Sequence, residues 1–533
     1  MSVRVYKMQI IGKGTWLDSV AGKLIEREKK IGRDLRLIKV ESGLGASGMP
    51  HIGSLGDAVR AYGIKMALEN MGYKSELIAY SDDMDGLRKI PEGLPEWLKE
   101  HLAKPVSMIP DPFDCHNSYG AHMSSMLIDA LNRLGIKHKF QSGIEAYKQG
   151  LLVKQIDIIL SNAKYIGEKI EELVGQEKFK NSLPYFPVCS NCKRIYVAEA
   201  YEYLEEEKKV LYKCKGTKMG DNFVDGCGNE GCADIRTNDG KLGWKVEFAA
   251  RWNAFSVRFE AYGKDIMDSV KVNDWIADEV LKYPHPLHVK YEMFLDKSGK
   301  KISKSIGNVL TPQMWFRYGS HHSIMLLLFK RIKGTRNVDL SDIPKLMDEY
   351  NYLEDVYFGR VKIDNELKKI KLRGIYEYIN HQDPPSMPFQ HIPYMLLVQL
   401  VSIMHGDNRI DYTINKLKNY GTIKEKSNDL IDKIKLAGNW VDDFGFFEKI
   451  QVTVDEKQKQ ALSDLIKVMK NENDPINLQT KIFEVARSNN IEPKDFFKLL
   501  YAILLDAERG PRLGPYIIDI GIDKVIITLK QYV

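Results

Sequence analysis

The chain has 533 residues, a length that at roughly 100–200 residues per domain corresponds to several domains and excludes a single small module. Hydrophobic residues make up 44% of it and charged residues 28%, as in ordinary folded proteins, so disordered and fibrous classes are also excluded. Lys and Arg number 78 and Asp and Glu 72, and the net charge of +6 is too small to identify a nucleic-acid partner.

Strand and helix patterns alternate in the first part of the chain. A largely apolar run at 35–40 predicts a strand, a glycine-rich segment follows at 41–48, and apolar residues at helical spacing from Leu55 to Met66 predict a helix. Gly72 ends this helix, a second strand is expected at 76–80, and a helix at 123–134 and a strand at 136–140 repeat the order. The alternation predicts an α/β fold with a doubly wound parallel sheet of the Rossmann type.

The segment from Pro50 to Ser54 joins the first strand to the first helix, which is where open α/β sheets bind nucleotides. A histidine at position 51 can hydrogen-bond phosphate oxygens, and glycines at 43, 45, 48 and 53 let a flat ligand approach the backbone. The alternative is an ordinary tight turn in which Ser54 is the N-cap and Asp57 completes a pair similar to a capping box. This segment alone does not separate the two interpretations.

Five of the six cysteines fall within residues 189–232, in a part of the chain (183–243) whose short glycine-containing segments suggest an inserted module. In a large chain without an export signal, such a cluster indicates metal ligands rather than disulfides, although buried free thiols are the alternative. The predicted zinc ligands are Cys189, Cys192, Cys214 and Cys227. The site should be structural, because four cysteines leave no open position; whether Cys232 replaces one of them stays open. Cys115 and the pair His321-His322 are expected to be packing and surface residues.

A late strand is expected at 288–295, and it leads directly into a basic loop at 297–305. Lys301 and Lys304 stand three apart among small residues, a spacing that lets both meet the phosphates of a triphosphate. Taken alone, such a loop is usually a solvent-facing turn. A His-Ile-Gly turn at the start of an α/β domain, followed about 250 residues later by Lys-Ile-Ser-Lys-Ser, is a much rarer combination.

Strand patterns are nearly absent after about residue 340, and apolar residues recur at helical spacing at 462–469 and 496–503. We therefore expect a catalytic α/β domain at 1–335, the inserted zinc module at 183–243 within it, and an all-α domain at 336–533. The longest charge-free stretch, 384–406, has an apolar part shorter than the ~20 residues of a membrane span, and the N-terminus does not resemble an export signal. We expect a cytoplasmic protein without a membrane partner.

The two motifs resemble the His-Ile-Gly-His and Lys-Met-Ser-Lys-Ser signatures of the class I aminoacyl-tRNA synthetases. The wider sequence looks most like the class I lysyl-tRNA synthetases of archaea and some bacteria, through matches at 12–16, 25–30, 41–43, 81–85, 88–91, 251–252, 259–260, 263–265, 291–292 and 508–512. Ser54 stands where the family has His or Asn, which weakens that phosphate or ribose contact. Ile266 stands where many relatives carry a histidine, so an amino-acid contact through that histidine is not expected.

The resemblance implies ATP-dependent ligation of L-lysine to lysine tRNA through a lysyl-adenylate, with the 2′-hydroxyl of the terminal ribose as first acceptor. It implies that His51, Lys301 and Lys304, with Mg²⁺, stabilise the separating phosphates and are the catalytic groups. The implied ATP-binding residues are Gly48, His51, Gly53, Ser54, Lys301, Ser303 and Lys304. The helical C-terminal part would read the lysine anticodon, and lysine activation would depend on bound tRNA.

For the amino acid, the resemblance implies that Gly43 and Gly45 shape the pocket and that Trp252 and Tyr291 are its aromatic walls. A lysine needs apolar faces for its methylenes and an anionic or aromatic end for its ammonium, but the two aromatics can equally be core residues. The candidate anions, not ranked by the sequence, are Glu41, Asp82, Asp83 and Glu292. Two rivals remain: a class I synthetase for glutamate, cysteine or arginine, and an inactive zinc-containing RNA-binding relative.

Overall fold

The computed structural model describes residues 11–219, 222–296, 298–299, 310–402, 408–444, 452–505 and 511–533. The chain divides into two units, and each is a compact body. The first consists of Met1–Gln313, Met325–Asp339 and Ile363–Pro384, and the second of Met314–Ile324, Leu340–Lys362 and Pro385–Val533. The chain therefore passes between the units several times around the domain boundary that the sequence suggested at 335/336.

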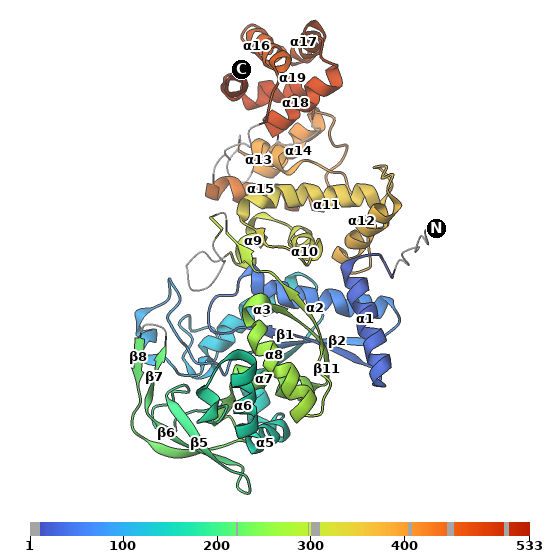
Figure 1. The fold of residues 1–533 in the computed structure, drawn as a ribbon. Coiled ribbons are helices and arrows are strands. Elements are labelled where there is room, and N and C mark those ends of the chain that lie inside the picture. The colour runs from blue at the N-terminus through green and yellow to red at the C-terminus, as the bar shows by residue number, and fades with distance from the viewer. Residues whose placement is uncertain are drawn as a thin grey trace, which may run out of the picture. The chain divides into compact units, whose positions relative to one another are not determined.

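A five-stranded parallel sheet organises the first unit (Figure 1). In spatial order its strands are β12 (Leu287–Tyr291), β11 (Val257–Gly263), β1 (Ile38–Leu44), β2 (Ser75–Ser81) and β3 (Lys139–Ser142). The chain runs from β1 to one side through β2 and β3, and later returns to the other side of β1 through β11 and β12. This reversal confirms the doubly wound prediction and places a ligand-binding crevice at the carboxyl ends of the central strands.

Two helices at the N-terminal end of the chain lie side by side, and the second packs on β1, β2 and β11 (Figure 1). α1 (Trp16–Ile31) begins with a capping box between Thr15 and Asp18 and ends at Gly32, whose φ of 77° is left-handed. α2 (Ile52–Asn70) is buried on most of its faces because the sheet and α1 enclose it. Its first turn is thereby held at the end of β1.

The strand boundaries differ from the predicted ones in three places. β1 spans Ile38–Leu44 rather than 35–40, so this strand continues into the predicted glycine-rich segment. β3 begins at Lys139 rather than at 136, and the predicted strand at 288–295 is interrupted after Tyr291. Among the described strands, β12 pairs only with β11, and this pairing ends where Gly263 faces Tyr291. The chain then leaves the sheet, and β13 (Phe294–Leu295) pairs with β14 (Arg336–Asn337) instead.

A long insertion separates β3 from β11. Its helices and short strands are α4 (Gly143–Lys148), α5 (Val153–Ser161), α6 (Ala163–Val174), β4 (Tyr185–Pro187), β5 (Ala198–Leu204), β6 (Lys209–Cys214), β7 (Gly216–Met219), β8 (Asn222–Asp225), β9 (Glu230–Asp234), β10 (Gly240–Leu242) and α7 (Trp244–Phe255). β4 and β10 pair antiparallel and form the root of the cysteine-rich module, while β5, β6 and β9 form an antiparallel sheet and β7 and β8 a hairpin. α3 (Tyr119–Arg133) precedes β3, and α8 (Met267–Trp275) follows β11.

The described residues of the second unit contain helices and no strand, in agreement with the sequence pattern. The remaining helices of the chain are α9 (Pro312–Tyr318), α10 (His321–Phe329), α11 (Ile343–Tyr357), α12 (Glu366–Ile379), α13 (Tyr394–Val401), α14 (Arg409–Asn419), α15 (Asn428–Phe444), α16 (Glu456–Met469), α17 (Pro475–Ser488), α18 (Pro493–Leu505), α19 (Leu513–Ile520) and α20 (Ile522–Leu529). Among the described residues, no helix has both the length and the apolar character needed to cross a bilayer.

Candidate active site

A cavity of about 620 Å³ lies at the carboxyl ends of β1, β2, β11 and β12. The first turns of α2, the segment 85–91 and one face of α7 complete its lining. A second cavity, of about 660 Å³, lies at the opposite edge of the sheet and is lined by residues such as Tyr73, Lys74 and His138. In doubly wound folds ligands bind at the carboxyl edge, so the first cavity is the candidate site.

His51 is the N-cap of α2 and faces this cavity. Its Nδ1 accepts a hydrogen bond from the backbone N–H of Ser54 at 3.2 Å, so the alternative in which Ser54 is the N-cap is wrong. Glycine suits position 53, because a Cβ there would lie 2.7 Å from the His51 ring and would force the ring to shift. The helix N-terminus and its histidine thus present donors of the kind that bind phosphate.

The predicted glycines and Ser54 belong to the described residues, whereas the predicted site residues of the basic loop do not. Gly43, Gly45, Gly53 and Ser54 line the cavity, whereas Gly48 is buried and lies outside the lining. Lys301, Ser303 and Lys304 lie outside the described residues.

The floor of the cavity is a buried charge network centred on two cations. Arg251 of α7 is 1% exposed, and it pairs with Glu41 at 2.9 Å, with Asp82 at 2.8 Å and more loosely with Glu260 at 3.6 Å. Lys241 of β10 is equally buried and pairs with Asp85 at 2.6 Å and with Glu247 at 2.7 Å. Five carboxylates therefore share two cations in this floor.

The excess of carboxylates over cations is accompanied by raised pKa values of two floor carboxyl groups. Burial raises the pKa of Glu41 to about 8 and that of Asp82 to about 7, although the Arg251 guanidinium acts in the opposite direction. A carboxylate that is buried without enough positive charge is held partly protonated near neutral pH. The floor can accept a further cation, which would stabilise the ionised carboxylates.

The four candidate anions differ in their positions relative to the cavity. Asp82 and Glu292 line the cavity, whereas Glu41 lies below its surface. Asp83 also lies outside the lining, and it accepts hydrogen bonds from the Ser142 hydroxyl at 2.6 Å and from the Ile144 N–H at 2.7 Å at the start of α4. The lining also contains carboxylates that were not among the candidate anions predicted from the sequence: Asp57, Asp85, Glu260 and Asp265.

Tyr291 lines the cavity, and its hydroxyl donates a hydrogen bond to Asp57. Trp252, the other expected wall, has no exposed surface and lies outside the lining. Its indole N–H instead donates to Glu260 at 2.5 Å, so Trp252 holds a floor carboxylate from below. The aromatic surface on α7 comes from Trp244 and Phe248, which with Arg251 recur at helical spacing on one face.

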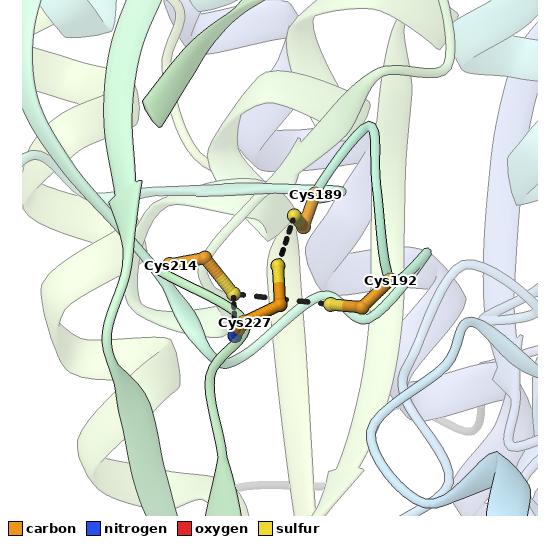
Figure 2. A group of neighbouring side chains, drawn as sticks. All are labelled: Cys189, Cys192, Cys214 and Cys227. Atoms are coloured by element: carbon orange, nitrogen blue, oxygen red, sulfur yellow. Dashed lines mark hydrogen bonds between the residues drawn. The ribbon is translucent and has the colours of Figure 1, made fainter. Parts of the chain in front are cut away.

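The four cysteines predicted as zinc ligands come together in the inserted module (Figure 2). Their sulfurs lie within 4.8 Å of one another, with Cys189 and Cys227 at 3.6 Å and Cys192 and Cys214 at 3.8 Å. Thiolates about 2.3 Å from a tetrahedral zinc stand roughly 3.8 Å apart, so this cluster can hold a zinc ion. Cys232 lies on β9 and is not part of the group.

A second group of metal-type ligands was not predicted from the sequence, where Cys115 was expected among packing and surface residues. Asp111, Cys115, His116 and His122 place their ligand atoms within 4.8 Å of one another. The Cys115 sulfur lies 3.2 Å from Nδ1 of His116 and 3.3 Å from Nδ1 of His122, and the carboxylate of Asp111 is buried beside them. A carboxylate, a thiol and two imidazoles are zinc ligands, and their spacing along 111–122 is the signal that was available.

Comparisons with known proteins indicate a single family. Residues 14–382 match a family model described as tRNA synthetases class I (K). A lysine-tRNA ligase of Cenarchaeum symbiosum is 53% identical over 518 residues, which cover 97% of this chain and 98% of the relative. The lysine-tRNA ligase of Methanosphaera stadtmanae is 29% identical, covering 96% and 98%, and that of Rickettsia bellii is 28% identical, covering 97% and 95%.

Proposed function

The chain belongs to the class I tRNA synthetases of the K type, and from this membership we propose that it ligates L-lysine to its cognate tRNA in an ATP-dependent reaction. Lysine and ATP form lysyl-adenylate and pyrophosphate, and the lysyl group then passes to the terminal ribose of lysine tRNA with release of AMP. Neither step requires a nucleophile from the enzyme. The protein contributes binding, orientation and charge stabilisation.

The observation that carries the choice of lysine is the charge imbalance in the floor of the cavity. Five carboxylates share Arg251 and Lys241, and the ionised floor lacks positive charge that a lysine ammonium supplies. A glutamate substrate would add another negative charge, and cysteine would leave the imbalance unchanged. Arginine is also cationic, and the names of the full-length relatives favour lysine over it.

For activation, the N-terminus of α2 and His51 would bind phosphate oxygens of ATP, and Gly53 and Ser54 would lie against the nucleotide. Lys301, Ser303 and Lys304 would approach the β- and γ-phosphates from the basic loop, as the family signature implies. Mg²⁺ bound with ATP would neutralise phosphate charge, and lining carboxylates such as Glu292 are oxygen ligands of the kind it prefers.

For the amino acid, Gly43, Gly45 and Tyr291 would line the lysine pocket, and Trp252 would act through Glu260. Gly48 would support the nucleotide turn from beneath it. Both metal clusters would hold structural zinc, because each supplies four protein ligands and leaves no open position. The part of the chain at 336–533 would read the lysine anticodon, and we expect the enzyme to work in the cytoplasm without a membrane partner.

The test is amino-acid-dependent exchange of pyrophosphate into ATP, run with and without lysine tRNA. We expect exchange with lysine, and none with glutamate, cysteine or arginine at the same concentration. Exchange with one of those three and not with lysine would replace the substrate. No exchange with any amino acid, in a protein that still binds tRNA, would favour the inactive RNA-binding relative.

A further inference from the structure

The inserted module supports one wall of the cavity directly. The Tyr196 hydroxyl accepts a hydrogen bond from the Gly86 N–H at 3.1 Å, and the guanidinium of Arg88 lies 5.2 Å from the centre of the Tyr196 ring. Gly86 and Arg88 both line the cavity, while Tyr196 belongs to the module. The wall formed by segment 85–91 is therefore packed against the module and does not stand alone.

The strongest of these contacts is an ion pair from the root of the module. Lys241 lies on β10, where it is 1% exposed, and its ammonium is 2.6 Å from Asp85 and 2.7 Å from Glu247. Glu247 is held in turn by the hydroxyl of Tyr147 at 2.8 Å, which also accepts from the Leu242 N–H at 2.9 Å. A buried lysine between two carboxylates is fixed in position, because any displacement leaves a charge unpaired.

Asp85 is held through one of its two oxygens. Lys241 at 2.6 Å and the indole N–H of Trp244 at 3.3 Å both donate to Oδ1. Among the described residues, Oδ2 has no hydrogen-bond partner, and Asp85 lines the cavity. The arrangement fixes the orientation of the carboxylate while leaving one oxygen for a ligand.

We propose that Lys241 is a positioning residue through which the inserted module shapes the amino-acid site: it orients Asp85 so that Oδ2 accepts a hydrogen bond from an ammonium group of bound lysine. This inference rests on the proposed function. It assigns the module a part in substrate binding that is separate from holding a metal ion. Asp85 touches the substrate, and Lys241 acts through it.

The pH dependence of lysine binding reports on this contact. The titratable and charged groups that face Asp85 are Asp82, Arg88, Tyr196, Lys241 and Glu247. Burial alone would lower the pKa of Lys241, but Asp85 and Glu247 raise it well above its usual value, so Lys241 stays charged at any working pH. Removing this charge raises the pKa of Asp82, which lines the same cavity, above its value of about 7, because the Lys241 ammonium lowers that pKa.

The experiment compares Lys241→Met with the wild-type enzyme in pyrophosphate exchange in the presence of lysine tRNA. We expect the KM for lysine to rise about tenfold, the effect of misplacing one charged hydrogen-bond partner, with little change in the KM for ATP. The acidic limb of kcat/KM for lysine should also move to higher pH. In Asp85→Asn the further change Lys241→Met should have no additional effect on the KM for lysine, since Lys241 acts through Asp85.

Lys213→Met is the matched control, because Lys213 lies in the same module and forms an exposed ion pair with Glu230 at 2.6 Å. It should leave the KM for lysine and the pH profile unchanged. If Lys241→Met does not fold, Trp244→Phe removes the other donor to Asp85 and should raise the KM for lysine severalfold. If the variant that folds has the same KM for lysine and the same pH profile as the wild type, this inference is overturned. A wild-type enzyme without lysine-dependent exchange would instead overturn the proposed function itself.

Discussion

Asp82→Asn tests whether the ionised floor of the cavity binds the substrate ammonium. Asp82 lines the cavity, pairs with Arg251 at 2.8 Å, and has a pKa raised to about 7 by burial. If lysine binding needs the ionised form, the free enzyme at pH 6 has only about one-tenth of Asp82 ionised, and the KM for lysine should be about tenfold above its value at high pH. Asparagine keeps the shape of the side chain and removes this titration.

The assay is the KM for lysine in pyrophosphate exchange from pH 6 to 8.5. In the wild-type enzyme the KM should fall as pH rises through about 7, and in Asp82→Asn it should stay high with little dependence on pH in this range. The variant and the wild type should therefore differ most at pH 8.5 and least at pH 6. Asp34→Asn, which changes an exposed carboxylate, should follow the wild type, and the KM for ATP serves as an internal reference. A wild-type lysine KM that is independent of pH and equal to that of Asp82→Asn would refute the reasoning.

Four further predictions concern metal, chemistry, stability and tRNA. Metal analysis of protein purified without chelator should find about two zinc ions per chain. The variants Cys192→Ser and His122→Ala should each lose one zinc ion, and Cys232→Ser should lose none. A zinc-free protein with free thiols would contradict both sites. Lys304→Ala should slow single-turnover adenylate formation by roughly two to three orders of magnitude with little change in lysine binding, and an unchanged rate would exclude a role on the leaving pyrophosphate. Glu41 and Asp82 have pKa values of about 8 and 7, above those of an unfolded chain, so from about pH 4 to about pH 8 the folded state binds more protons than the unfolded state. The Tm of the free enzyme should therefore fall as pH rises from 6 to about 8, and a rising Tm would contradict this. Pyrophosphate exchange should be weak without tRNA, rise with lysine tRNA and fall when an anticodon base is changed. Equal charging of lysine tRNA and its anticodon variants would contradict an anticodon-reading role of the helical part.

The features that the sequence predicted are those set by neighbouring residues. The strand, the glycine turn and the helix around His51 follow from local periodicity, and the zinc cluster follows from a Cys-x-x-Cys turn and two further cysteines. The helical character after residue 340 is also local, and Pro475 stands in the first turn of α17, a position that proline favours.

The ion pairs in the floor of the cavity could not be predicted from local sequence patterns. Arg251 and Asp82 are 169 residues apart, and Lys241 and Asp85 are 156 apart, so no spacing relates the partners. Trp252 illustrates the limit: its position at the site was anticipated, but only the fold decides that its ring lies beneath Glu260 rather than on the cavity surface. The ligand spacing at Asp111 was visible in the sequence and was overlooked, because its single cysteine lies outside the main cluster.

The pairing of β4 with β10 has a consequence for how this chain can be shortened. The backbone enters the cysteine-rich module through Tyr185–Pro187 and leaves it through Gly240–Leu242, so the two ends of a segment of more than 50 residues already stand one strand spacing apart. A two- or three-residue hairpin turn could close this gap at little cost in chain entropy. Such a miniaturised enzyme would lack the cysteine cluster but keep Lys241, which lies on the retained strand. It would also lack Tyr196, which contacts Gly86 and Arg88, so it would separate the effect of Lys241 at the root from the effect of the rest of the module.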